Sequence, residues 1–469
     1  MEALFLASLA VSAIACGVDA ADPEQDEADA DAGEFDTNEE VHPEDLSATY
    51  EPFVPSDADD ATRAIATTLV VIDSADGEPM PPSVRREAEA IQIRLAHALE
   101  VAEGAPSLLA RDADDEKIQL TYRGKQPVTM ASEDEEPEVS SGQPFVMPEK
   151  YQDGAQWMTG FNPSTGSEFE LRIPEEFSTL VGNDAEARGI SRGTHSEATE
   201  EFTARGIVGP NDTRVMKGAL NTKQSSANLR KLVNFGCTGA LVGPRHVLTA
   251  AHCIYTSAGW TGRTLRVGRN GSDFWGSAVT ISGSTTANSS TYTNNGNIYW
   301  ISSAYKAAKD QNQDNFAWDI GMIITPNNYL ATSAGWFGWN VSNYSHDDLY
   351  NRGYPNCSDA AAPTPNGETC KQNHMYGDTN KCGSGGFSSQ EKDSSGFSLF
   401  GYHTCDTSAG HSGSPLYRKN GDGDWVVRGV HKGFLRPGGG GGDGYATQSF
   451  ALITQSRANL ISWYRSAYP

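Results

Sequence analysis

From about Gly206 to its end, the chain consists of short β-prone runs separated by Gly, Ser, Thr and Asn. Such runs between turn residues are typical of a sandwich or barrel of short antiparallel strands. Only the extreme C-terminus differs, because the apolar residues within Ile453–Tyr464 fall on one face of a helix. We therefore predict an all-β domain over residues 206–469 that ends in a helix. The expected strands cover Cys237–Val242, His246–Ala250, Leu265–Val267, Ala278–Ile281, Ile320–Ile324, Trp425–Val430 and Phe450–Ile453.

Charge divides the 469-residue chain into two unlike parts. Residues 1–205 hold 45 acidic and 13 basic residues, a net charge of −32, whereas residues 206–469 hold 16 and 22, a net charge of +6. This asymmetry argues against one uniform domain. No clustered basic face stands out, so the sequence predicts no nucleic-acid partner. We expect a monomer that uses no cofactor and no metal.

The first fifteen residues form an apolar stretch that is too short to span a bilayer and ends in small residues. Residues 1–15 are therefore interpreted as an export signal. Two alternatives stay open at its end: Ala13–Cys16 resembles the lipobox of bacterial lipoproteins, whereas Ala15 suits an ordinary secretory cleavage. Both place the mature protein outside the cytoplasm of a bacterium, either secreted or attached to the cell envelope by a lipid on Cys16.

Residues 16–205 separate this signal from the β-rich part. Residues 16–62 are rich in Asp, Glu and Ala and poor in aliphatic residues, which predicts an acidic, disordered tether. Residues 63–205 are predicted to be a partly folded prosegment. Its expected elements are a strand at Ala66–Asp73, a helix at Ser83–Glu103 and a strand at Ile118–Arg123.

The cysteines agree with export. Six of the seven lie after residue 206, and an even number in an exported domain predicts a disulfide framework. Only the Cys237–Cys253 pair is predicted, because Cys253 follows a histidine at a strand end and Cys237 lies on the strand before. The pairing of Cys357, Cys370, Cys382 and Cys405 stays open.

Two segments carry the base and the nucleophile that serine catalysis requires. Val247–Cys253 follows a strand and ends in His252 beside a cysteine, which predicts a general base. Asp406–Pro415 contains a Gly-x-Ser-Gly-x-Pro turn whose small residues allow a sharp bend. We predict Ser412 as the nucleophile and the N–H groups of Gly410 and Ser412 as an oxyanion hole.

A third segment supplies the carboxylate that would orient the base. Asp319 lies inside the apolar run Phe316–Ile324, where a charged group is costly unless it is paired. An imidazole N–H is a suitable partner. The nearby Asp310 and Asp314 lie in a polar stretch, so Asp319 is the predicted orienting carboxylate.

Taken in the order His252, Asp319, Ser412, these segments resemble the trypsin/chymotrypsin superfamily of serine peptidases over most of residues 206–469. Within it the chain is most similar to the bacterial glutamyl endopeptidases. The resemblance implies two six-stranded antiparallel β-barrels with the catalytic residues between them, preceded by the acidic, partly disordered prosegment. The shared motifs are Cys-Thr-Gly at 237–239, Ala-His-Cys-Ile-Tyr at 251–255, Gly-Arg-Asn-Gly at 268–271, and the Asp-Thr start and Ser-Gly-Ser-Pro end of the serine turn.

The resemblance also implies a preference for Glu before the scissile bond. Thr407 lies five residues before Ser412, where these enzymes place a hydroxyl that binds the substrate carboxylate, and His431 matches their assisting histidine. Lys432 adds positive charge nearby. Asp406, six residues before Ser412, leaves an alternative, since trypsin-like enzymes use an Asp there to bind Arg or Lys.

Gly206–Gly209 resembles the new N-terminus of an activated trypsin zymogen. In trypsins that amine pairs with an Asp directly before the nucleophile, but His411 occupies this position here. We expect the acidic prosegment to cover the basic domain until the chain is cleaved between Glu200 and Gly206. Protein or peptide substrates and this prosegment are thus the expected partners, and a non-catalytic binding protein on a peptidase scaffold is the rival hypothesis.

Overall fold

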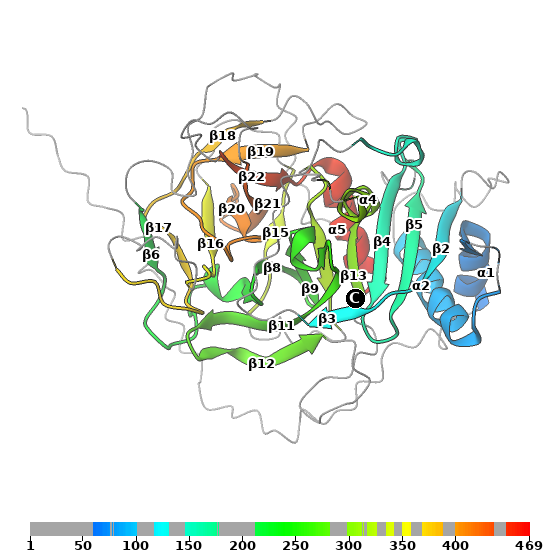
Figure 1. Cartoon of the computed structure of the whole chain (residues 1–469), viewed down its shortest axis with the longest axis horizontal. Coiled ribbons are helices and arrows are strands. Elements are labelled where there is room, and N and C mark those ends of the chain that lie inside the picture. The colour runs from blue at the N-terminus through cyan, green and yellow to red at the C-terminus, as the bar shows by residue number, and fades with distance from the viewer. Residues whose placement is uncertain are drawn as a thin grey trace, which may run out of the picture. The chain divides into compact units, whose positions relative to one another are not determined.

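The computed structural model of the whole chain is mainly β-sheet and ends in a helix (Figure 1). All seven strands expected after residue 206 are present, so the all-β prediction is confirmed. The expected export signal, Cys16, the acidic tether and the expected cleavage segment lie outside the described residues. The structure describes residues 60–75, 77, 79–100, 117–130, 146–175, 177, 212–281, 298–311, 313, 317–325, 334–341, 349–357, 368–387, 399–435 and 447–469.

The N-terminal region, defined as the described residues from Asp60 to Phe177, combines two helices with five strands. The elements are α1 (Asp60–Leu69), β1 (Val70–Ser74), α2 (Pro82–Glu100), β2 (Ile118–Lys125), β3 (Val128–Met130), the 3₁₀ turn η5 (Glu149–Tyr151), β4 (Gln156–Asn162) and β5 (Ser167–Ile173). The expected helix and second strand are confirmed as α2 and β2. The strand expected at Ala66–Asp73 is wrong in its first half, which is the end of α1.

Packing explains this difference. Ala66 is buried in a small cluster with Ile93 and Ala96 of α2, so α1 lies against α2 through small side chains. The chain becomes extended only at Val70, where β1 begins a parallel pairing with β2. The run of β-branched residues that suggested a strand therefore starts within α1, a helix that its contacts with α2 stabilise.

The first sheet contains 13 strands and joins both regions of the chain. Its order is β1-β2-β5-β4-β13-β14-β9-β8-β7-β11-β10, with β12 and β3 both paired to β11. Five of these strands come from the N-terminal region, so the sheet is larger than the six-stranded barrel expected. The strands after residue 211 are β7 (Leu232–Asn234), β8 (Thr238–Gly243), β9 (His246–Thr249), β10 (Tyr255–Thr256), β11 (Gly259–Asn270), β12 (Asp273–Ile281), β13 (Ile298–Ser302) and β14 (Gly321–Ile324).

The second sheet contains nine strands, in the order β18-β19-β22-β21-β20-β16-β17-β6, with β15 paired to β21. All are from the C-terminal region, defined as the described residues from Asp212 onward. The two largely antiparallel sheets correspond to the two barrels that were predicted. The strands are β6 (Arg214–Met216), β15 (Gly338–Trp339), β16 (Tyr350–Gly353), β17 (Tyr376–Asp378), β18 (Ser384–Phe387), β19 (Phe400–His403), β20 (Pro415–Lys419), β21 (Trp425–Leu435) and β22 (Thr447–Leu452).

The C-terminal region contains two α-helices and two 3₁₀ turns, which are α4 (Ser303–Asp310), α5 (Gln455–Ala467), η7 (Leu229–Lys231) and η8 (Ala251–Cys253). The predicted C-terminal helix is confirmed as α5. The expectation of no other helix is wrong at α4, which Ser302 begins by accepting the N–H of Ala304 at 3.2 Å. The Lys306–Asp310 pair, 2.8 Å apart, adds an i,i+4 contact on this short helix.

One hydrophobic core connects the regions. Leu95 of α2, Phe161 of β4 and Trp300 of β13 belong to the same buried cluster, which continues to Tyr464 of α5. The N-terminal strands therefore lie beside the green strands of the C-terminal region in Figure 1. Among the described helices, none has the length and apolar character needed to cross a membrane.

Candidate active site

His252 and Asp319 meet because two neighbouring strands align their ends. β9 and β14 are antiparallel partners with Thr249 opposite Gly321, so the residues just after β9 lie beside those just before β14. The His252 backbone N–H donates to Asp319 Oδ1 at 2.9 Å, and His252 Nδ1 lies 2.7 Å from Asp319 Oδ2. Two contacts from one residue fix the orientation of the imidazole ring.

Asp319 is fully buried and ionised. Burial alone raises the pKa of a carboxyl group, but the attraction of His252, its two hydrogen bonds and the nearby Lys432 lower the pKa of Asp319 to about 2. Lys432 Nζ lies 4.0 Å from Asp319 Oδ2. The carboxylate is therefore a permanent anion behind the imidazole at every pH near neutrality.

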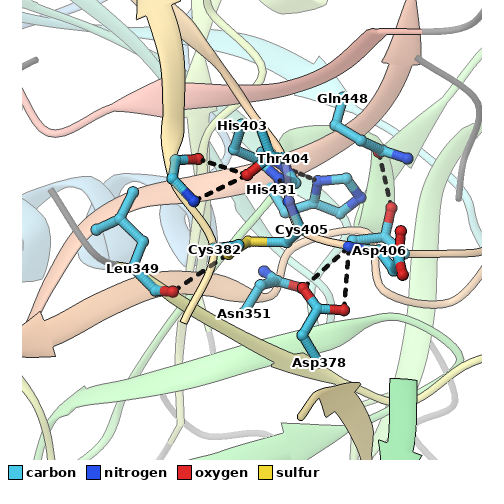
Figure 2. The surroundings of a disulfide bond; sticks show 12 residues. Leu349, Asn351, Asp378, Cys382, His403, Thr404, Cys405, Asp406, His431 and Gln448 are labelled. Carbon is cyan, nitrogen blue, oxygen red and sulfur yellow. Dashed lines mark hydrogen bonds between the residues drawn. A yellow bond between two sulfur atoms is a disulfide. The ribbon is translucent and has the colours of Figure 1, made fainter. Parts of the chain in front are cut away.

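Three disulfides join the six cysteines of the C-terminal region. Cys237 is bonded to Cys253, the pair that the sequence indicated, and this ties β8 to the turn that carries His252. The pairs that the sequence left open are Cys357–Cys370 and Cys382–Cys405. The second of these joins the chain just after β19 to the chain just before β18 (Figure 2).

The serine turn needs glycine at two positions. Gly410 and Gly413 have φ values of +86° and +83°, a backbone conformation that residues other than glycine rarely adopt. A Cβ on Gly410 would also meet the backbone of Tyr354, and one on Gly413 would meet Thr249. Thr238 holds the turn from the first sheet, since its N–H donates to Ser412 O at 2.8 Å and its hydroxyl to Gly410 O at 2.9 Å.

The turn leaves two backbone donors available. The N–H of His411, between them, donates to Ser408 O at 3.0 Å, which closes a tight turn. Within the described part of the chain, the N–H groups of Gly410 and Ser412 have no acceptor. These two N–H groups are the ones that the sequence predicts as an oxyanion hole.

The Ser412 hydroxyl donates to Lys432 O at 3.2 Å. In the described residues it makes no hydrogen bond with His252, so the predicted nucleophile and base are not joined in this arrangement. Catalytic hydrogen bonds are often long before a substrate is bound. A rotation of one side-chain torsion of Ser412 would change the partner of its hydroxyl.

His431 lies on β21 next to the serine turn, since its backbone exchanges hydrogen bonds with Gly413 and Ser414. Its Nδ1 is 2.9 Å from Nε2 of His403, a residue that sequence reasoning did not assign to the site (Figure 2). Burial lowers the pKa of both rings, that of His431 to about 3, so both are neutral. This pair is the main site feature that the sequence did not indicate.

The hydrogen bonds of this pair determine where its protons are. The Cys405 N–H donates to His403 Nδ1 at 3.2 Å, so the proton of the neutral His403 ring is on Nε2. His403 then donates to His431 Nδ1, which leaves the proton of His431 on its Nε2. This hydrogen-bond relay from Cys405 through His403 leaves an N–H donor on His431 Nε2, and a backbone hydrogen bond with Ser449 already engages the ring.

The other two predicted specificity residues are buried and engaged. The Thr407 hydroxyl donates to Gln448 Oε1 at 2.7 Å. The Asp406 carboxylate accepts the Thr213 N–H at 2.8 Å and the Thr213 hydroxyl at 2.7 Å. Asp406 is thus directed toward the chain before β6, which lies almost 200 residues earlier in the sequence and could not be identified from it.

Two groups of possible metal ligands occur in the described residues, and neither suits a metal. One contains His252 with Cys237 and Cys253, and the other contains Asp378 with Cys382 and Cys405. All four cysteines are in disulfides, whereas a metal is bound by the thiolate. Each group therefore retains a single usable ligand.

Two β-sheets, a buried Asp–His pair and a glycine-rich serine turn define a trypsin-like protein. Comparison with known families agrees, since the sequence model of the trypsin family matches residues 217–453. The chain belongs to the trypsin family, and the predicted resemblance is confirmed.

Individual relatives are more distant. The chain is 32% identical over 114 residues to the protein named extracellular metalloprotease of Bacillus subtilis (strain 168). That match covers 24% of this chain and 29% of the relative, so the chain spans less than a third of its length.

Two solved structures are similar at low scores. A Glu endopeptidase in complex with MPD has 19% identity and a TM-score of 0.36, and the match covers 55% of this chain and 99% of that one. The protease Anisep from Arthrobacter nicotinovorans has 16% identity and a TM-score of 0.33, with 53% and 99% covered.

Proposed function

We propose that the protein is an exported serine endopeptidase in which Ser412, His252 and Asp319 form the catalytic triad. The observation that carries this proposal is the fully buried Asp319 carboxylate, held on His252 by two hydrogen bonds. A buried carboxylate in this position stabilises the imidazolium that forms when serine loses its proton. The free N–H groups of Gly410 and Ser412 support the same role for the serine turn.

In the proposed reaction, His252 Nε2 takes the proton of Ser412 Oγ as the oxygen attacks the peptide carbonyl. The carbonyl oxygen becomes an oxyanion and accepts the N–H groups of Gly410 and Ser412. His252 then passes its proton to the leaving amine, and an acyl-enzyme remains. Water repeats the sequence in the second half, which releases the acid and restores Ser412.

For specificity we propose cleavage after Glu. The relay from Cys405 through His403 gives His431 an N–H donor on Nε2, and a carboxylate is the acceptor that makes the strongest hydrogen bond with it. The donor would exchange the Ser449 backbone for the substrate. Thr407 is the second proposed donor, and it would exchange Gln448 for the substrate. Cleavage after Arg or Lys through Asp406 is less favoured, because Thr213 already occupies that carboxylate.

Maturation by chain cleavage is part of the proposal. His411 is buried and, by burial first and then by the charge of Arg214, its pKa is held well below the usual range. A neutral ring offers no anion to a new N-terminal amine. We therefore propose that cleavage between Glu200 and Gly206 activates the enzyme without the ion pair that trypsins use.

A set of chromogenic peptides that differ only in the residue before the scissile bond tests this function. We expect kcat/KM for Glu to exceed that for Gln by about 10- to 100-fold, the value of one or two hydrogen bonds to a charged group. Because His431 is neutral, with its pKa lowered to about 3, the Glu-to-Gln ratio should stay constant from about pH 5.5 to about pH 9.

Ser412→Ala is the control and should lose at least about 10⁴-fold in kcat. If the ratio of kcat/KM for Glu to that for Gln falls as the pH rises, with a midpoint near pH 6.5, His431 is charged at lower pH. That result would contradict the proposed neutral His403–His431 pair. Faster cleavage after Lys or Arg would assign the pocket to Asp406. Hydrolysis unaffected by Ser412→Ala would overturn the triad itself.

A further inference from the structure

The N-terminal region supplies a neighbour for a strand of the peptidase fold. β13 pairs with β14 on one side and with β4 on the other, with Trp300 opposite Gly160 and Ile301 opposite Thr159. All five residues of β13 are buried. Without β4, this strand would expose a row of unpaired backbone groups beside apolar side chains, which is a site for aggregation.

Aromatic packing also joins the N-terminal and C-terminal regions across the boundary between β4 and the strands of the C-terminal region. Phe161 of β4 stacks on Trp260 of β11 with ring centroids 4.6 Å apart and planes 6° apart. Trp300 lies so close to β4 that a Cβ on Gly160 would be 2.6 Å from its ring. Phe161, Trp260 and Trp300 are all at most 1% exposed, so the rings are out of water only while the two regions remain together.

The polar groups at this boundary are also paired across it. Glu168 of β5 accepts the indole N–H of Trp260 at 2.7 Å and lies 3.6 Å from Lys306 of α4. The hydroxyls of Thr159 and Ser303 are 2.9 Å apart. Separation would leave several buried groups without the partners that offset their desolvation.

Two further contacts widen the boundary. β3 adds to β11 as a parallel neighbour, with Val128 opposite Trp260. Away from this strand pair, α2 packs on α5, and the Arg94 guanidinium of α2 lies 4.8 Å from the centre of the Tyr468 ring. The N-terminal region is thus attached through a sheet edge, an aromatic cluster and a helix pair.

We propose that residues 60–177 remain bound to the peptidase domain as a non-covalent subunit after the chain is cleaved within residues 178–211. This inference rests on the proposed maturation. The partner of β13 is therefore a segment of this same chain. β4 is not a neighbour of the strands that carry the site, because β13 separates β4 from β14, and His252 and Asp319 lie at the ends of β9 and β14. We therefore expect the bound region to leave the site open.

Charge is not what holds the region in place. Residues 1–59 contain 17 acidic and no basic residues, so much of the acidity lies outside the region that makes these contacts. The contacts described above are mainly strand pairing and buried rings, and the Glu168–Lys306 ion pair is a minor part of them. We therefore expect the complex to persist at about 1 M salt, where the Debye length is only about 3 Å.

The test uses the full chain with Ser412→Ala, so that binding is measured independently of catalysis. A recognition sequence for an unrelated site-specific protease is placed within residues 178–211, and the cut protein is analysed by size-exclusion chromatography. We expect both fragments to elute together at low salt and at about 1 M salt, and to separate only in denaturant. Fragments that separate under native conditions would overturn the proposal.

Gly160→Val provides a sharper version, because the added side chain would meet Trp300. Gly421→Val is the matched control, since a Cβ on Gly421 meets nothing within 4 Å. We expect Gly160→Val to release the fragment at lower denaturant than the control. Equal behaviour of the two variants would show that the β4–β13 contact does not hold the complex.

The cut chain with Ser412 intact tests whether the bound N-terminal region leaves the site open. We expect it to hydrolyse peptides while both fragments still elute together. Activity that appears only in fractions that have lost residues 60–177 would show that the region blocks the site and would contradict the proposal. Absence of activity from both fractions would instead count against the proposed triad, and the elution result with Ser412→Ala would be unaffected.

Discussion

Lys432 places a positive charge beside the carboxylate that orients the proposed base. Its Nζ is 4.0 Å from Asp319 Oδ2, and its side chain is 9% exposed. Its backbone oxygen accepts the Ser412 hydroxyl, so the residue contacts two members of the proposed triad. A cation here opposes formation of the imidazolium on His252.

Replacing Lys432 by Met should therefore shift the pH dependence of the enzyme. Without the cation, the His252–Asp319 pair binds a proton more readily, so the acidic limb of kcat/KM should move to higher pH by about half a unit to one unit. Lys432→Arg, which retains the charge, is the control. Equal pH profiles for Lys432→Met and the parent would show that Lys432 has no electrostatic role.

At the scale of residues, a base, an orienting carboxylate and a nucleophile could be proposed from the sequence because each lies in a local motif. His252 follows a strand beside a cysteine, and Asp319 interrupts an apolar run. The environment of Asp406 and the His403–His431 contact could not be predicted, because both depend on residues brought together from different strands. Sequence spacing fixes a position in the chain but not the direction of a buried side chain.

At the scale of elements, the chain before β6 holds β17 to the serine turn. The Thr213 hydroxyl is 2.7 Å from Asp406 Oδ2 and 3.1 Å from Asp378 Oδ1, but it has only one proton to donate. Both contacts are hydrogen bonds when Asp378 is protonated, because Asp378 then donates to the Thr213 hydroxyl and the hydroxyl donates to Asp406. Burial first, and then the charge of Asp406, raises the pKa of Asp378 to about 7.

Asp378→Asn tests this arrangement, since an amide resembles the protonated acid in shape and can donate to Thr213. A carboxyl group whose pKa is raised by folding contributes stability at low pH and loses it as the pH rises through the folded value. We expect the parent to lose several degrees in Tm relative to Asp378→Asn between about pH 4 and about pH 8. Asp422→Asn, at an exposed site, is the control.

If the difference in Tm between the parent and Asp378→Asn does not change with pH, Asp378 is ionised throughout and the proposed hydrogen-bond chain is wrong. Arg352 also faces Asp378 and lowers its pKa. The observed midpoint therefore reports the balance of burial and the charge of Asp406 against Arg352.

Seven strands of the C-terminal region (β8, β9, β11, β12, β14, β21 and β22) were predictable because turn residues mark their ends. β4 and β5 were not, since their run contains Gly160 and is followed by Pro and Ser residues that suggest a loop. Gly160 is present because Trp300 occupies the space that its side chain would fill. The reason for that residue lies in another strand, which is why local sequence patterns did not indicate the strand.

At the scale of the whole molecule, the difference in charge suggested two separate parts, yet the structure joins them in one sheet and one core. Net charge describes how a chain interacts with solvent and ions, but it does not determine the fold. The continuous cluster from Leu95 to Trp300 and Tyr464 shows that apolar patterning decided this architecture. The N-terminal region is thus part of the folded unit as well as the expected prosegment.

The most direct test of the central claim is covalent labelling of the cleaved chain with a fluorophosphonate, which reacts with activated serine hydroxyls. Mass spectrometry should find one adduct, on Ser412, with none in Ser412→Ala and much slower labelling in His252→Ala. The account predicts this single modified residue. A folded protein that remains unlabelled, or that is labelled on another residue, would contradict it.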